Sequence, residues 1–178
     1  QGAATRLISL EAIRGGLDIA QARFGPRRLS TTEAASDPRT LLSDVAGALF
    51  LDMDRNAARW QRTRGSTSVP LIGTAPAQAP EGDTPTQVDG LIATFRLAYR
   101  SLMDVWSLLL PPGTMVELRR LTVDDSGPFR LPDRTWARIV YDFALGYRLR
   151  LISRDHLLGA MTPLYLAWVA THVLELQT

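Results

Sequence analysis

Two closely spaced aspartates in the N-terminal half carry the sharpest chemical pattern of the chain. Asp52 and Asp54 directly follow the apolar residues 48–51 and are separated by Met53. Two carboxylates held side by side can bind a divalent cation, and one of them can attack phosphorus as a nucleophile. The pair is therefore a candidate metal site for phospho-transfer or glycosyl-transfer chemistry.

An apolar run followed by Asp-x-Asp resembles the first motif of haloacid-dehalogenase-type phosphatases and the Asp-x-Asp motif of nucleotide-sugar glycosyltransferases. The resemblance implies that a strand delivers Asp52 and Asp54 to a divalent cation. In this chain the same residues fit a long helix, on which positions i and i+2 point to different sides of the axis. Arg55 and Asn56 also stand where the phosphatase motif has Gly-Thr or Gly-Val. A metal-dependent transfer enzyme therefore stays an alternative, and a solvated helix face is favoured.

The rest of the composition excludes several kinds of catalytic site. The chain has no cysteine, which removes thiolate nucleophiles, disulfides and cysteine-bound zinc. All 20 basic residues are arginine, so a lysine Schiff base and a P-loop lysine are excluded. The two histidines, His156 and His172, have no serine nucleophile in an elbow motif beside them. We therefore expect no catalytic residue, no cofactor and no metal set, and an enzyme is not favoured.

Three arginines gather where the last two predicted helices join. Arg148, Arg150 and Arg154 could bind an anionic ligand, because the guanidinium fork matches phosphate and carboxylate groups. Asp142 and Asp155 lie close enough in sequence to neutralise them in an ion-pair network, which we favour. A formal net charge of +2 gives no strongly basic surface, so nucleic acid is not favoured as a ligand. A regulatory helical domain that binds an anion through these arginines is an alternative function.

Aromatic side chains are concentrated in the C-terminal half. Trp136, Tyr147 and Trp168 belong to this group, and at helical spacing most such residues pack in the core. Trp, Tyr and Arg also dominate the energetic centres of protein interfaces. We therefore take these three aromatic residues, together with the three arginines, as candidate interaction residues.

Hydrophobic periodicity predicts an all-α fold, a bundle of about five to six helices. We expect an N-terminal helical segment over residues 1–65, a Pro/Gly-rich linker or long loop over 66–86, and a C-terminal helical lobe over 87–178. The linker holds four prolines and two glycines and few large apolar residues. No strand-and-crossover pattern is present, so a doubly wound sheet is not expected.

Local signals place the helix ends. Asp37 before Pro38 is typical of an N-cap followed by a first-turn proline. Thr114 and Asp133 are expected to cap the helices that they precede, and Ser153 or Asp155 to start the last one. The first predicted helical segment covers residues 4–24, as one helix or as two short helices separated at the double glycine 15–16. The other predicted helices cover residues 38–64, 87–110, 115–121, 133–151 and the segment that ends at 176.

Residues 157–174 carry no formal charge and approach the length of a membrane span. Glycine, proline and polar residues lower the apolarity of this region, namely Gly159, Thr162, Pro163, Thr171 and His172, and Glu175 closes it. A buried core helix is therefore expected, and docking on a membrane is a minor alternative. No signal peptide is apparent, because charged residues interrupt the apolar positions of residues 1–17. We expect a cytoplasmic location.

Taken together, these patterns favour a non-catalytic protein–protein interaction or assembly domain. The exclusive use of arginine is typical of a GC-rich bacterial genome, and we expect the chain to belong to a larger bacterial protein. Its partner would be another protein or a second copy of itself.

Overall fold

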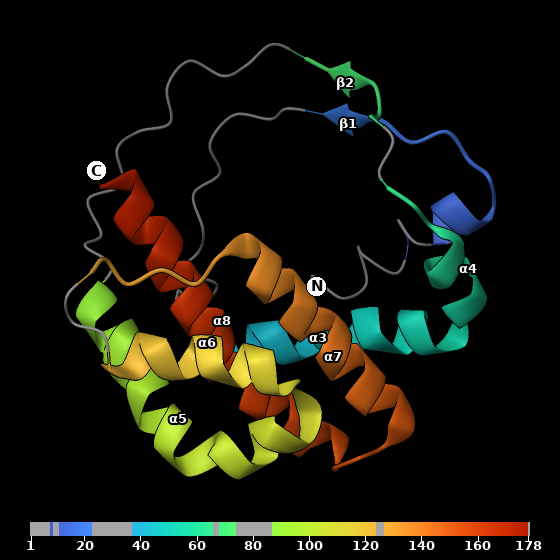
Figure 1. The fold of residues 1–178 in the computed structure, drawn as a ribbon. Coiled ribbons are helices and arrows are strands. Elements are labelled where there is room, and N and C mark those ends of the chain that lie inside the picture. Colours follow the sequence, from blue (N-terminus) through green and yellow to red (C-terminus); the bar gives the residue numbers. More distant parts are fainter. Residues whose placement is uncertain are drawn as a thin grey trace. The chain divides into compact units, whose positions relative to one another are not determined.

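The computed structural model describes residue 8 and residues 11–22, 37–65, 68–73, 87–123 and 127–177. Of these residues, 76% are helical and 3% lie in strands, which confirms the predicted all-α fold. The chain divides into two compact units, Gln1–Thr84 and Pro85–Thr178, whose elements are labelled in Figure 1. Most of the predicted linker lies outside the described residues.

A helical turn over residues 11–14 opens the described part of the N-terminal unit and ends at the double glycine. The N–H of Gly15 donates to the carbonyl of Glu11 at 2.8 Å. Gly16 has a φ of +69°, a left-handed conformation that glycine adopts at little cost. The helix predicted to continue to residue 24 is therefore wrong for residues 17–22, because the two glycines end it.

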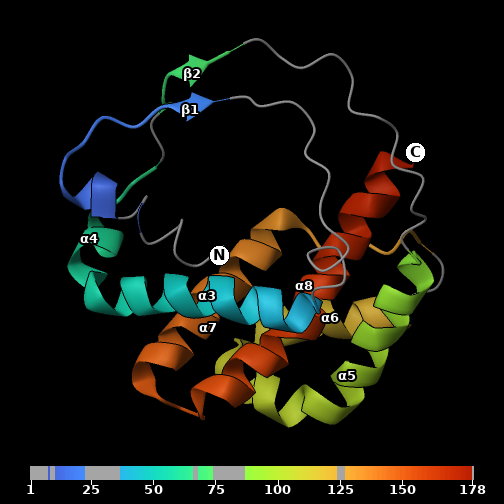
Figure 2. The ribbon, with the colours of Figure 1, turned by 180° about the vertical axis from the view of Figure 1, so that it is seen from behind.

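The chain that follows is extended and forms half of a two-stranded parallel pair. β1 (Gln21–Ala22) pairs with β2 (Leu71–Ile72), and Gln21 stands opposite Leu71. The N–H of Gln21 donates to the carbonyl of Pro70 at 2.9 Å. Figure 2 shows the two strands side by side. Part of the segment predicted as a linker thus takes extended structure within this unit.

The start of α3 (Pro38–Arg55) is the one that the sequence predicts. The Asp37 carboxylate accepts a hydrogen bond from the N–H of Arg39 at 3.2 Å, and Pro38 takes a first-turn position that needs no N–H. A single helix to residue 64 is wrong, however. Asn56 leaves helical geometry, with φ −118° and ψ 31°, and the chain restarts as α4 (Ala57–Arg62).

Among the described residues, four helices build the C-terminal unit: α5 (Val88–Leu109), α6 (Pro112–Val123), α7 (Asp133–Leu149) and α8 (Arg154–Leu176). α8 packs against both α5 and α7, and α6 packs against α5 (Figures 1 and 2). Fully buried side chains from all four helices form the core; the largest are Trp106, Phe95, Phe143, Leu118, Ile139, Leu157, Met161 and Leu164.

The helix α8 is the centre of this unit. Of the described helices, it alone is long and apolar enough to cross a membrane. Eight of its residues are buried, and its Ala160 carbonyl accepts a hydrogen bond from the indole N–H of Trp106 at 2.9 Å. Pro163 lies inside the helix, which continues to Leu176. These contacts are those of a core helix.

α6 begins earlier than its sequence predicts. Its first residue is Pro112, and Thr114, the expected cap, is buried inside the first turn. The carbonyl of Pro111 accepts from the N–H of Met115 at 3.1 Å and closes that turn. The difference follows from the tolerance of a helix for proline at its first positions, where no backbone donor is needed.

The ends of α7 and α8 agree with expectation in part. Asp133 is the first helical residue of α7, and Pro132 takes the capping position in its place. Arg150 ends α7 with a left-handed φ of 53°. Ser153 caps α8 by accepting from the N–H of His156 at 3.4 Å, which confirms one of the two predicted starts.

Candidate functional site

The carboxylate of Asp52 is occupied by hydrogen bonds inside the N-terminal unit. Asp52 lies near the end of α3 and is 9% exposed. Its Oδ1 accepts from Nδ2 of Asn56 at 2.7 Å, and its Oδ2 accepts from Nε1 of Trp60 at 2.9 Å. Asn56 lies at the corner between α3 and α4, and Trp60 lies in α4. The carboxylate therefore links the end of α3 to α4.

Asp54 lies two residues further along the same helix. Positions i and i+2 on a helix differ by about 200° around the axis, so the two carboxylates do not face one point. Within the described ranges, no group of three or more His, Asp or Glu side chains is placed to hold a metal ion. The geometry of Asp52 and Asp54 is thus that of a helix rather than of the strand-borne pair that metal-dependent transfer requires.

Two of the candidate interaction residues meet between α7 and α8. The rings of Trp136 and Trp168 stack with centroids 5.6 Å apart and an interplanar angle of 20°. Tyr165 packs against both, with centroids 6.0 Å from Trp136 and 6.1 Å from Trp168. All three side chains are partly buried, so this aromatic cluster joins the two helices.

Polar contacts secure the aromatic cluster at the start of α7. Oδ1 of Asp133 accepts from the indole N–H of Trp168 at 2.8 Å. Nε2 of His172 lies 3.3 Å from the same oxygen, and its ring is 4.4 Å from that of Trp168. The first turn of α7 is therefore tied to the middle of α8. Sequence reasoning did not assign Asp133 or His172 to this role, because the contact joins residues far apart in the chain.

The other candidate residues lie where α7 meets the start of α8. The guanidinium carbon of Arg154 stands 4.6 Å from the centroid of the Tyr147 ring, a cation–π contact. Tyr147 is only 5% exposed and belongs to the core. Arg148 and Arg150 are exposed. The structure thus brings Arg154 onto Tyr147 and leaves Arg148 and Arg150 at the surface.

A row of large apolar side chains faces outward along α7. Tyr141, Leu145 and Leu149 are 58%, 54% and 58% exposed. Their i, i+4, i+8 spacing places them on one face. Arg134, Arg138 and Arg148 share or border this face by the same periodicity. We call these six residues the outer face of α7.

One carboxylate at the edge of the outer face is poorly solvated. Oδ2 of Asp142 is buried and has no hydrogen-bond partner among the residues that the structure describes. Burial raises the pKa of Asp142 above its ordinary value of 3.8, and the positive charge of Arg138 one turn earlier opposes that rise. Burial therefore disfavours the ionised form of Asp142.

The apolar residues of the outer face are visible in the sequence, but hydrophobic periodicity does not show which side of α7 is exposed. α7 has two apolar rows, and the row with Ile139, Phe143 and Tyr147 points toward the core. The second row can be recognised as a surface feature only when the solvent-facing side of the helix is known.

The chain matches no protein-family model, no curated protein and no solved structure.

Proposed function

We propose that the C-terminal unit is a non-catalytic protein-interaction domain and that the outer face of α7 is its contact surface. The observation that carries this proposal is the row of Tyr141, Leu145 and Leu149, each more than half exposed. The solvent side of a helix is ordinarily polar, and contiguous exposed apolar side chains mark contact surfaces. The row extends over about 12 Å of the helix, since each residue adds about 1.5 Å.

The charges beside the row define the partner. Arg134, Arg138 and Arg148 give the outer face a positive border, and arginine next to apolar side chains is typical of interface centres. The partner that complements this surface is an amphipathic helix of another protein, with an apolar stripe and acidic flanks. A second copy is a poorer partner, because pairing the same face would bring arginine against arginine.

A protein also fits better than a membrane surface. The apolar row is one side chain wide, which suits a groove or stripe on a partner helix. Asp142 borders the row, and Glu117 lies 3.9 Å from Arg138 through its Oε1. Both carboxylates would repel anionic lipid headgroups, whereas an acidic helix can direct its charges to the arginines.

The fixed position of α7 supports the proposal further. The stacked pair Trp136 and Trp168 holds the start of the helix against α8, and the contact between Tyr147 and Arg154 holds its end. A helix fixed at both ends loses little conformational entropy when a partner binds. Four of the six sequence-derived candidate residues thus support the proposed contact surface, Arg148 belongs to it, and Arg150 has no part in it.

The experiment uses the full chain and three labelled peptides, with binding followed by fluorescence anisotropy. The first peptide is an amphipathic helix with a leucine stripe flanked by glutamates. The second has lysine for glutamate, and the third has the composition of the first in scrambled order. We expect only the first to bind, and more weakly as salt rises. Equal binding of the first and third peptides would contradict the proposal.

Light scattering over a concentration series completes the test. We expect the mass of one chain at every concentration. A dimer that persists in high salt and dissociates in the variant Leu145→Ser would assign the outer face to self-association and overturn the assignment of a different partner.

A further inference from the structure

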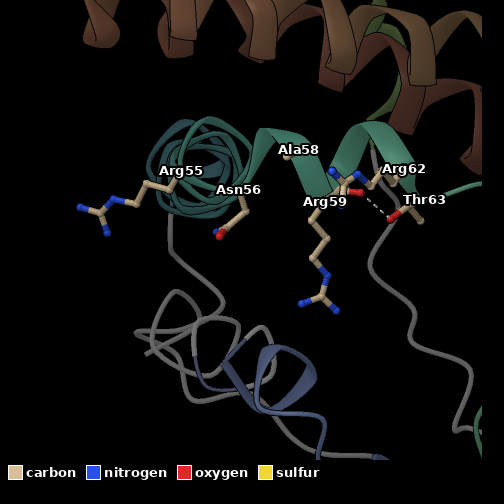
Figure 3. Close-up of a pocket in the computed structure, with 6 residues that line it drawn as sticks. All are labelled: Arg55, Asn56, Ala58, Arg59, Arg62 and Thr63. Atoms are coloured by element: carbon tan, nitrogen blue, oxygen red, sulfur yellow. Dashed lines mark hydrogen bonds between the residues drawn. The ribbon is translucent and has the colours of Figure 1, made fainter.

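A second candidate site lies in the N-terminal unit and is independent of the proposed function. Residues 55–64 contain four arginines and no acidic residue. Within them, a surface hollow of about 550 Å³ is lined by Arg55, Asn56, Ala58, Arg59, Arg62 and Thr63. Figure 3 shows the side chains of Arg55 and Arg59 extending away from the helices, with Asn56 between them.

The positive charge of this hollow is not neutralised by the described part of the chain. Among the described residues, no ion pair includes Arg55, Arg59 or Arg62. The guanidinium of Arg59 makes one hydrogen bond within the described ranges, to the carbonyl of Ile13 at 3.5 Å. The nearby carboxylate of Asp52 is already bonded to Asn56 and Trp60 rather than to an arginine. Three arginines that line one hollow, and that form no ion pair with the described residues, favour an anionic ligand.

A smaller, mainly apolar recess adjoins the hollow. It has a volume of about 200 Å³ and shares Asn56, Arg59 and Thr63 with the hollow. Ile13 and Trp60 contribute its apolar walls, and Asp52 lies at its edge. The bond to Asp52 fixes the indole of Trp60, so the wall of the recess is preorganised.

We propose that the hollow and the recess together bind a nucleoside phosphate, either free or at the end of a nucleic-acid strand. Arg55, Arg59 and Arg62 contact the phosphate groups through charge-assisted hydrogen bonds. The planar base occupies the recess beside Trp60, where its faces meet apolar side chains. Arg59 lines both the hollow and the recess and therefore positions the phosphate groups next to the base.

The test measures binding of ATP, adenosine and inorganic tripolyphosphate to the full chain by calorimetry. The proposal predicts that ATP binds at least about tenfold more tightly than either fragment, because only ATP fills both parts. It also predicts that Arg59→Gln weakens ATP binding about tenfold, because a charge-assisted contact is lost. Arg64→Gln is the matched control, since Arg64 is exposed in the same segment and does not line the hollow.

The recess has its own variant. Ile13 is 45% exposed, so Ile13→Trp fills the recess without removing a buried side chain. This variant should bind ATP no better than tripolyphosphate. Competition by a short single-stranded RNA tells the two sources of the nucleotide apart. RNA and AMP are compared as competitors of ATP. If RNA displaces ATP more effectively, the site binds the end of a strand; if AMP does, it binds free nucleotides.

Three outcomes would overturn the proposal. If ATP and tripolyphosphate bind the unmodified protein with equal affinity, the base contributes nothing and the arginines form only a basic patch. Equal losses in Arg59→Gln and Arg64→Gln would mean that net charge, and not this site, attracts the anion. Absence of ATP binding at millimolar concentration would remove the site altogether.

Discussion

The indole N–H of Trp60 donates to Oδ2 of Asp52 at 2.9 Å and fastens α4 to the end of α3. The second carboxylate oxygen accepts from Asn56, so both oxygens of Asp52 face donors. The variant Asp52→Asn places an NH₂ group against one of these donors. We expect the free energy of unfolding of the N-terminal unit to fall by about 1–3 kcal/mol, the cost of leaving a buried polar group unpaired.

Denaturant unfolding checks this prediction. Asp44→Asn is the control, because Asp44 is exposed on the same helix. A variant Asp52→Asn with unchanged stability, combined with loss of a measurable affinity for Mg²⁺ or Mn²⁺, would show that Asp52 serves a metal site instead.

Gly146 marks the closest approach in the C-terminal unit. A Cβ at this position would lie 2.5 Å from Cδ2 of Leu109 and 3.4 Å from Cδ1 of Leu157. Leu109 is 8% exposed and has little room to move. Overpacking of this kind costs about 1–3 kcal/mol, more than the 0.5–1 kcal/mol or so that alanine gains over glycine in a helix. Gly146→Ala should therefore lower the melting temperature.

Gly90 provides the matched control for this change. It lies in the first turn of α5, and among the described residues a Cβ there would meet only Cβ of Gln87 at 3.9 Å. Gly90→Ala should keep or raise the melting temperature, because no clash opposes the gain in helix propensity. Equal effects of the two substitutions would mean that α7 does not approach α5 as closely as described.

The partly buried carboxylate of Asp142 predicts a pH-dependent stability. Burial raises the pKa of Asp142 in the folded chain above 3.8, so the folded state binds the proton more tightly than the unfolded chain does. Stability from this group is thus present below pH 3.8 and is lost as pH rises through the folded pKa. Asp142→Asn cannot ionise and should be more stable than the parent at pH 7, with a smaller difference at pH 4.

Thermal unfolding at the two pH values measures this difference. Asp104→Asn is the control, since Asp104 is exposed on α5. If Asp142→Asn were less stable than the parent at pH 7, attraction between Asp142 and Arg138 would outweigh the cost of burial, contrary to the order of the two effects given above.

Helix starts with strong local chemistry could be predicted from the sequence. Asp37 and Ser153 cap their helices through bonds to residues two or three positions away, so a short window of sequence contains the whole signal. The break at Asn56 could not be predicted in this way. It coincides with the bonds of Asp52 to Asn56 and Trp60, and hydrophobic periodicity does not report such side-chain bonds.

The candidate sites could be predicted only in part, because the sequence does not show which side chains remain exposed after folding. Their residue types make Trp136 and Trp168 candidate interaction residues, and they pack against each other between α7 and α8. Leu145 was not identified, because an apolar residue on a helix is ordinarily assigned to the core. The apolar recess beside Arg59 depends on the approach of Ile13 from a segment far away in the sequence, which no local pattern encodes.

The most direct test of the contact surface compares two leucines with equal exposure. Leu145 on α7 and Leu108 on α5 are each 54% exposed. Binding of the acidic amphipathic peptide is measured for Leu145→Ser and for Leu108→Ser. We expect the first variant to lose affinity roughly tenfold, as truncation of an interface residue does, and the second to match the parent protein. Equal affinities of the two variants, or a larger loss in Leu108→Ser, would contradict the assignment of the outer face of α7.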